Sequence, residues 1–244
     1  MAGRWSEKKD VAQISCFFSS KAEVTEDTIQ SFEYSLKNVL QEASITETSE
    51  NPSARLWVDA YSADGKITLV NGKNTLDANA IGIGGDFFMF HPLKPITGAY
   101  FSGNDLMQDY CIIDQDTAWQ LFGSNDVVGM TVYIGNVPHI VTGVVQRPDS
   151  RMDKAAGLNS TVVYVSYETL SAYGTNNGIN HYEIVMPNPV DEFAYGKVKE
   201  GIGIDEKNVE IVENSRRYSL PNWIKTILAF GTRSMNGKAI IYPY

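Results

Sequence analysis

Two aspartates that directly follow an apolar, strand-like run are the residues whose types and spacing could do chemistry. Asp114 and Asp116 stand two positions apart. In phosphoryl transfer, one such carboxylate can attack phosphorus while the other acts as the acid. The same stretch can instead cap a short helix over residues 118–122, because an oxygen of Asp116 or Thr117 can accept a bond from an unpaired first-turn amide. The threonine falls one position early for such a pair, and no signal of a lysine with an acidic pair stands out later in the chain, so the pattern favours capping.

The three histidines of the chain, His91, His139 and His181, show neither the paired spacing nor the cysteine partners of a zinc site. We interpret His91 as a loop histidine. We expect His139, which lies inside a predicted hairpin, to face solvent. The sequence therefore predicts no metal site.

Other polar residues also lack the pattern of a catalytic or nucleotide site. The cluster of glycines at residues 82–85 has neither the Lys-Ser/Thr of a Walker loop nor the full G-x-G-x-x-G spacing, which favours close backbone approach within a strand. No acid/base couple can be established among Asp59, Asp64, Asp86 and Glu183. We expect no cofactor and no catalytic activity.

Composition narrows the class of protein. The 244 residues are 43% hydrophobic and carry a formal net charge of −9, which disfavours binding to a phosphate backbone. Cys16 and Cys111 lie in apolar runs, and buried free thiols are the simplest interpretation. No apolar run reaches the roughly 18 residues of a membrane-spanning helix, and the N-terminal residues lack the apolar core of a signal peptide. Taken alone, these absences would indicate the cytoplasm.

Hydrophobic periodicity indicates two strand–helix–strand units, at residues 11–62 and 181–213. In the first unit, apolar residues from Ile29 to Ala43 recur at helical spacing after a cap at Thr25. Two such units can pair as a split βαβ, ferredoxin-like sandwich. We therefore predict an α+β fold with two lobes, in which a mostly β lobe is inserted between the two units.

Turn signals and composition set the expected boundaries. Asp64-Gly65, Asn71-Gly72 and Gly135-Asn136 each have the chemistry of a tight hairpin turn, and Gly123 is expected to end the short helix. The expected division of the chain has three parts. A discontinuous βαβ lobe covers residues 11–75 plus 159–214, and an inserted β-rich lobe covers residues 76–158. A C-terminal helix with its tail covers residues 215–244.

An amphipathic helix is expected over residues 220–230. Its apolar face would most often pack in a core, but it is separated from the second βαβ unit by a polar segment. Docking on a partner is therefore a second interpretation. The candidate interaction surface is Trp223, Ile227 and Phe230.

An ordered series of short segments resembles the extracytoplasmic core domain of MacB/FtsX-type permeases of ABC transporters. The similar segments are residues 84–106, 118–123 (AWQLFG), 128–135 (VGMTVYIG) and 139–146 (HIVTGVVQ). The resemblance implies a porter-like lobe of βαβ units and an inserted β lobe on the outer face of the membrane. It implies no catalytic residues.

The resemblance also implies what the parent protein does. The parent would pair with a cytoplasmic ATPase subunit through its membrane helices and would be dimeric. The domain would bind an exported substrate or an envelope protein and would move with the membrane helices. Two alternatives remain open at this point. The domain could be a module that regulates a cell-envelope hydrolase, or it could itself be a hydrolase or phosphoryl-transfer enzyme that uses Asp114 and Asp116.

Overall fold

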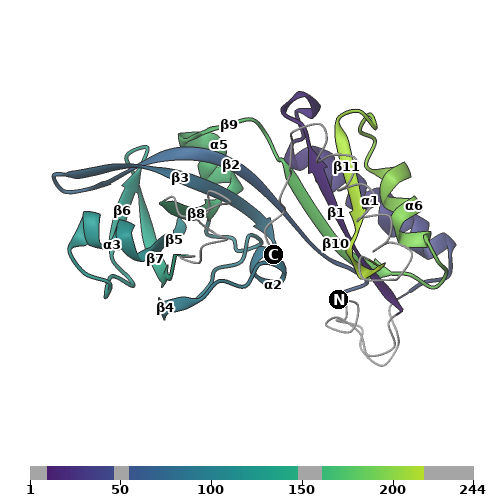
Figure 1. Cartoon of the computed structure of the whole chain (residues 1–244), viewed down its shortest axis with the longest axis horizontal. Helices are drawn as coiled ribbons and strands as arrows, with labels where there is room; N and C mark the ends of the chain where they lie inside the picture. Colours follow the sequence, from purple (N-terminus) through teal and green to yellow (C-terminus); the bar gives the residue numbers. More distant parts are fainter. Residues whose placement is uncertain (1–9, 47–54, 148–160, 217–244) are drawn as a thin grey trace, which may run out of the picture.

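The chain folds into two lobes that share one mixed sheet (Figure 1). The computed structural model describes residues 10–46, 55–147 and 161–216. In these residues the sheet has eleven strands, and its main path runs β11-β1-β10-β2-β3-β8-β5-β7-β4. Strand β2, Val58–Asn71, crosses from the first lobe into the second and is paired with β3, Asn74–Gly85, along most of its length.

The first lobe contains the two predicted βαβ units. Its strands lie in the order β11-β1-β10-β2, all antiparallel, and both long helices pack on the same side (Figure 1). This is the strand order of a split βαβ sandwich, so the predicted α+β class is confirmed. Besides β2, its elements are β1 Val11–Phe18, η2 Ser20–Ala22, α1 Glu26–Glu42, β10 His181–Pro187, α6 Phe193–Gly201, β11 Val209–Glu213 and η3 Asn214–Arg216.

Local sequence explains these elements. Thr25 and Thr28 form a reciprocal capping box at the start of α1, and Glu26 and Asp27 lie in the first turn, where the helix dipole favours acids. The helix buries a single stripe against the sheet, at Ile29, Phe32, Leu36 and Leu40. Alternate residues of β1 and β10 face the same core, including Ile14, Cys16, Tyr182 and Ile184.

The second lobe is mostly β, with two short helices. Strands β3 and β8 are parallel, as are β5 and β7, whereas the other pairs are antiparallel. The lobe encloses a separate apolar core, to which β2 contributes Ala63, Ile67 and Leu69. Its further elements are β4 Pro95–Gly98, β5 Tyr110–Asp114, α3 Gln115–Phe122, β6 Thr131–Ile134, β7 Val137–Val145, β8 Val162–Ser166, α5 Tyr167–Tyr173 and β9 Thr175–Asn176.

Of the three predicted hairpin turns, the one at Gly135-Asn136 is confirmed, the one at Asn71-Gly72 lies one residue later, at Gly72 and Lys73, and the one at Asp64-Gly65 is wrong. Gly135 and Asn136 both have positive φ, 57° and 67°, as a primed turn requires, and Gly72 has φ 59° between β2 and β3. At Asp64-Gly65 the strand continues, because Ala63 and Ile67 on either side are both buried in the core. Gly65 is needed there for a different reason, since a Cβ would collide with Leu170 and with the backbone of β9.

A third apolar cluster lies where the lobes meet. Helix α2, Phe87–Phe90, follows β3 directly, and its three phenylalanine side chains are buried. In one cluster, these phenylalanines join Ala60 of β2 and Val185 of β10 from the first lobe with Ile112 and Val145 from the second. The junction is therefore packed as a core and not only linked by strands.

Both cysteines are free and fully buried, as the sequence predicted. Burial raises the pKa of each thiol, Cys16 and Cys111, to about 12.

The predicted division of the chain at residues 75/76 and 158/159 stays a prediction, because the shared strands run through both lobes. Among the residues that the structure describes, no helix is long and apolar enough to cross a membrane.

A cross-strand contact of Tyr61 and Gly84 yields a first prediction. Tyr61 covers its partner Gly84, so a Cβ at residue 84 would lie within the tyrosine ring. The ring cannot yield easily, since Tyr61 Oη donates a 2.6 Å hydrogen bond to Glu26 and the ring packs on Tyr167. We expect Gly84→Ala to lower the free energy of unfolding by about 2 kcal/mol in urea titrations.

Gly196→Ala is the matched control for this prediction. Gly196 lies inside α6 with open space around its Cβ position, so alanine there should stabilise the chain by about 0.5–1 kcal/mol. Equal effects of the two substitutions would contradict the packing that we describe for Tyr61.

Candidate functional site

The two aspartates that could have done chemistry are held by one arginine. Asp114 is 3% exposed and ends β5, and Arg147 Nη2 lies 2.7 Å from its Oδ2. Asp116 lies in the first turn of α3 and pairs with the same guanidinium at 2.8 Å. Asp114 Oδ1 accepts a 2.7 Å bond from the Thr117 amide, and Oδ2 also accepts a bond from the amide of Val162.

These contacts make Asp114 the cap of α3. The capping interpretation is thus confirmed, but the cap is Asp114 and not Asp116 or Thr117, because the helix begins three residues before Ala118, at Gln115. Both oxygens of Asp114 are engaged, so neither is available to attack a substrate. Gly123 ends the helix with φ 73°, as predicted.

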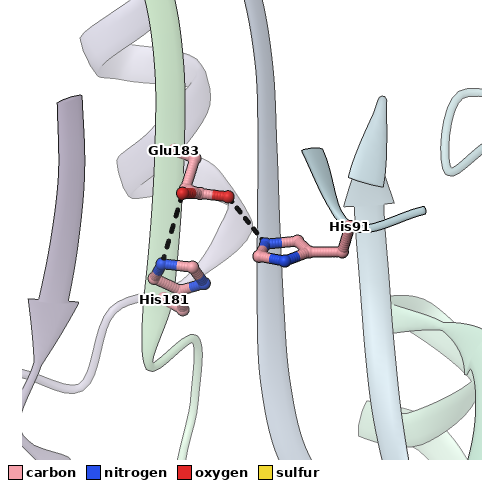
Figure 2. Close-up of side chains that lie close together, drawn as sticks. All are labelled: His91, His181 and Glu183. Carbon is pink, nitrogen blue, oxygen red and sulfur yellow. Dashed lines mark ion pairs between the residues drawn. The ribbon is translucent and has the colours of Figure 1, made fainter. Parts of the chain in front are cut away.

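A second cluster brings together residues that the sequence separates widely. His91 follows the C-terminal end of α2, whereas His181 and Glu183 lie two positions apart on β10 and share one face of the strand (Figure 2). His91 Nε2 lies 2.6 Å from Glu183 Oε2, and His181 Nε2 lies 4.0 Å from Glu183 Oε1. All three potential ligand atoms lie within 4.8 Å of one another.

A layer of neighbours fixes the orientation of this cluster. Ser15 Oγ donates a 2.6 Å hydrogen bond to Glu183 Oε1, and Asn214 Nδ2 donates one of 2.7 Å to Ser15 Oγ. The His181 ring stacks on Phe17, and the His91 ring packs against Phe87, with centroids 4.7 Å apart in both pairs. The cluster therefore joins α2 at the junction to the first lobe's sheet.

Charge and burial act in opposite directions on the buried glutamate. Burial alone would raise the pKa of Glu183, but the hydrogen bond and charge of His91, the nearby His181 ring and the hydrogen bond from Ser15 together outweigh it and lower that pKa. For His181, burial dominates and lowers the pKa, which favours the neutral imidazole. A neutral imidazole beside an ionised carboxylate is an arrangement that can bind a cation.

The sequence did not predict this cluster. His91 lies in a loop, as interpreted, but no pattern in the sequence indicated its acidic partner, Glu183. The only local signal is the i, i+2 spacing of His181 and Glu183, which places both on one strand face. The position of His91 depends on how α2 packs, which no local pattern contains.

The expectation that His139 faces solvent is wrong. His139 is 1% exposed, and its Nε2 lies 3.1 Å from Thr169 Oγ1, while Nδ1 lies 3.0 Å from the Val137 carbonyl oxygen. Burial lowers its pKa. It is a satisfied core histidine of the second lobe.

The chain also contains a half-buried pair of carboxyl groups. Glu33 on α1 and Asp59 on β2 are close enough to share a proton, and Tyr182 Oη donates a 3.0 Å bond to Asp59. Burial, with the hydrogen bond to Asp59 next in size, raises the pKa of Glu33 to about 8. Glu33 therefore holds the proton and donates it to Asp59 near neutral pH.

This pair predicts a pH dependence of stability. Because folding raises the pKa of Glu33, the folded chain binds a proton more tightly, so stability should fall as pH rises from about 4.5 to about 8. We expect Glu33→Gln to remove this fall in stability between pH 4.5 and pH 8. At pH 8.5 the substitution should stabilise the chain by about 1 kcal/mol, which is less than the whole pKa shift would give, because Glu33 is partly solvated. Urea titrations at pH 5 and 8.5 measure both effects.

Glu42→Gln, at the exposed end of the same helix, is the control and should leave the slope unchanged. If Glu33→Gln has the same slope as the wild-type chain, the shared proton does not exist. The candidate interaction surface of Trp223, Ile227 and Phe230 lies outside the described residues.

Comparisons with known proteins agree on one family. The profile of the MacB-like periplasmic core domain matches residues 11–211. The macrolide export ATP-binding/permease protein MacB of Chromobacterium violaceum is 31% identical over 99 residues, which is 40% of this chain and 15% of that protein. The protein of the same name from Burkholderia thailandensis is 30% identical over 122 residues, 48% of this chain and 18% of that protein. The matched part is thus a small fraction of these relatives.

A solved structure shares the fold. The periplasmic region of MacB from Actinobacillus actinomycetemcomitans superimposes with a TM-score of 0.51 and 17% sequence identity, covering 93% of this chain and 94% of that one. At that identity the likeness concerns the fold alone.

Proposed function

The chain belongs to the family of MacB-like periplasmic core domains, which are extracytoplasmic parts of ABC-transporter permeases, and from this premise we propose that it moves with the membrane helices of its parent during an ATP-driven cycle. The extracytoplasmic location agrees with the resemblance and not with the cytoplasm that an absent signal peptide would indicate. In this proposal the domain catalyses no reaction and binds an exported substrate or an envelope partner.

The observation that carries the proposal is the mechanical continuity of the two lobes. Strand β2 belongs to both, and the cluster around α2 fills the junction with buried aromatic side chains. A packed core resists deformation, so a displacement applied to one lobe would be passed to the other as a rigid-body movement.

We place the energy source elsewhere in the parent. The relatives are named as ATP-binding/permease proteins, and the matched part is at most about a fifth of their length. The 244 residues contain no nucleotide-binding motif. ATP would therefore be hydrolysed by a cytoplasmic part or subunit of a dimeric parent, and this domain would respond to it.

Two alternatives are less well supported. Regulation of a cell-envelope hydrolase relied on the surface of Trp223, Ile227 and Phe230, about which the described residues say nothing. Phosphoryl transfer relied on Asp114 and Asp116, and both carboxylates are held by Arg147. Transport or mechanical transmission thus remains the proposed role.

Cysteine labelling in intact cells tests the location. Tyr34 on α1 is 72% exposed, while Cys16 and Cys111 are fully buried, so a parent that carries Tyr34→Cys should react with a maleimide that cannot cross the inner membrane more strongly than the wild-type parent does. Labelling that requires rupture of the inner membrane would place the domain in the cytoplasm and end the proposal.

A further inference from the structure

Two histidines and one glutamate point at one small space between α2 and the first lobe's sheet (Figure 2). His91 approaches from the junction, and His181 and Glu183 approach from β10. We propose that His91, His181 and Glu183 bind a divalent transition-metal ion, and that Zn²⁺ is the ion that fits best.

An ion pair alone does not account for the cluster. His91 is explained by its contact with Glu183, but His181 Nε2 is buried and has no hydrogen-bond partner, and it lies too far from Glu183 for a hydrogen bond. Glu183 is 6% exposed, and its Oε2 contacts His91 only. An unsatisfied buried polar atom is costly, and the unpartnered His181 Nε2 faces the space that it shares with His91 and Glu183.

The donor set selects the class of metal. Imidazole nitrogen suits Zn²⁺ and its first-row neighbours, whereas Mg²⁺ and Ca²⁺ prefer sites made of oxygen alone. Two histidines and one glutamate are a known set of three zinc ligands, in which the fourth position is left to water. Of the three side chains His91 is the most exposed, at 38% against 19% for His181 and 8% for Glu183, so the open position would face solvent beside His91.

The distances are close to those that a metal needs. With bonds of about 2.0–2.1 Å, ligand atoms around a tetrahedral zinc ion lie about 3.3 Å apart. The measured separations from Glu183 are 2.6 Å to His91 and 4.0 Å to His181. Side-chain rotations that move each atom by about 1 Å or less would meet the geometry.

A second layer typical of metal sites is already present. Ser15 donates a hydrogen bond to Oε1 of Glu183 and is itself held by Asn214, which leaves Oε2 directed at His91. Phe17 stacks on the His181 ring and Phe87 packs against the His91 ring, which limits the rotation of both imidazoles. Such neighbours orient the ligands before the ion arrives.

A bound ion would join two parts of the fold. His91 belongs to the segment that enters the second lobe, and the other two ligands belong to the first lobe's sheet. The ion would therefore fasten α2 to β10 and stiffen the junction. This inference rests on the side-chain geometry and does not depend on the transport role.

Zinc titration of the 244-residue chain, first treated with EDTA and desalted, tests the proposal. We expect calorimetry to show one Zn²⁺ per chain and the midpoint of thermal unfolding to rise by about 5–10 °C at a hundredfold excess over Kd. His91→Ala, His181→Ala and Glu183→Gln should each weaken binding more than about 10-fold. Met89→Ala, two positions before His91 and not at a ligand, should bind as the wild type does.

X-ray absorption on the wild-type zinc complex keeps the proposal testable if a variant does not fold. Two imidazole nitrogens and additional oxygen ligands are the expected result. Failure of the wild type to bind zinc at one ion per chain, unchanged binding in all three ligand variants, or sulfur ligands in the absorption spectrum would each overturn the proposal.

Discussion

Asp114→Ala is expected to lower the free energy of unfolding by about 3 kcal/mol. The substitution removes the cap of α3, the bond to the Val162 amide and a buried ion pair with Arg147. Breaking a buried ion pair costs about 3–5 kcal/mol, and the lower value applies because Arg147 keeps its contact with Asp116. Urea titration measures the effect.

Two neighbouring variants separate charge from capping in this prediction. Asp114→Asn keeps an oxygen for the Thr117 amide and should cost about half as much. Asp116→Ala removes a side chain that is 47% exposed, and less than about 1 kcal/mol is expected. If the Asp114→Ala and Asp116→Ala variants were equally stable, Asp114 would not be the residue that anchors α3.

Phe88→Ala is expected to cost about 3–4 kcal/mol. Phe88 is 8% exposed and contacts three aromatic rings besides its neighbour Phe87, at Tyr100, Phe101 and Tyr164. Removing the ring leaves a cavity in the cluster at the junction, and such truncations cost about 3–5 kcal/mol. Thermal or urea unfolding of the purified chain measures the loss.

Met89→Ala is the matched control, because Met89 is the next residue of α2 and is 48% exposed. We expect a change within about 0.5 kcal/mol. In the parent transporter, Phe88→Ala should also weaken the coupling of ATP hydrolysis to export more than Met89→Ala does. Equal stability of the two variants would mean that the junction is not a packed core.

Local patterns in the sequence were sufficient for several elements. Helix α1 was predicted because Ile29, Phe32, Leu36 and Leu40 repeat at helical spacing after a cap, and helical periodicity requires no information from distant residues. The turn at Gly135-Asn136 was predicted for a similar reason, since few residues tolerate positive φ twice in succession.

Other features depended on what packs against them. Asp64-Gly65 has the composition of a turn, but Ala63 and Ile67 beside it are held in a core that includes Leu170 of α5, and burial of these residues outweighed the local preference. His139 shares its strand face with Val141, so the parity of β7 could have placed it inside. His91 and Glu183 are 92 positions apart, and no sequence pattern links them.

The distance between two labels in the parent transporter tests the central claim, that both lobes move as one body with the membrane helices. Cysteines that replace the exposed Tyr34 on α1 and Trp119 on α3 carry the labels, and the two cysteines of these 244 residues, Cys16 and Cys111, are fully buried. Pulsed electron paramagnetic resonance would measure label-to-label distances in the nucleotide-free and ATP-trapped states. Both labels in one copy give the distance within that copy, and Tyr34→Cys alone in each copy gives the distance between the two copies.

We predict that the distance within one copy stays unchanged while the distance between the two copies shifts on ATP trapping. A change within one copy would show that the lobes move separately. No change in either distance would show that the domain takes no part in the ATP-driven cycle, and either result would contradict the account.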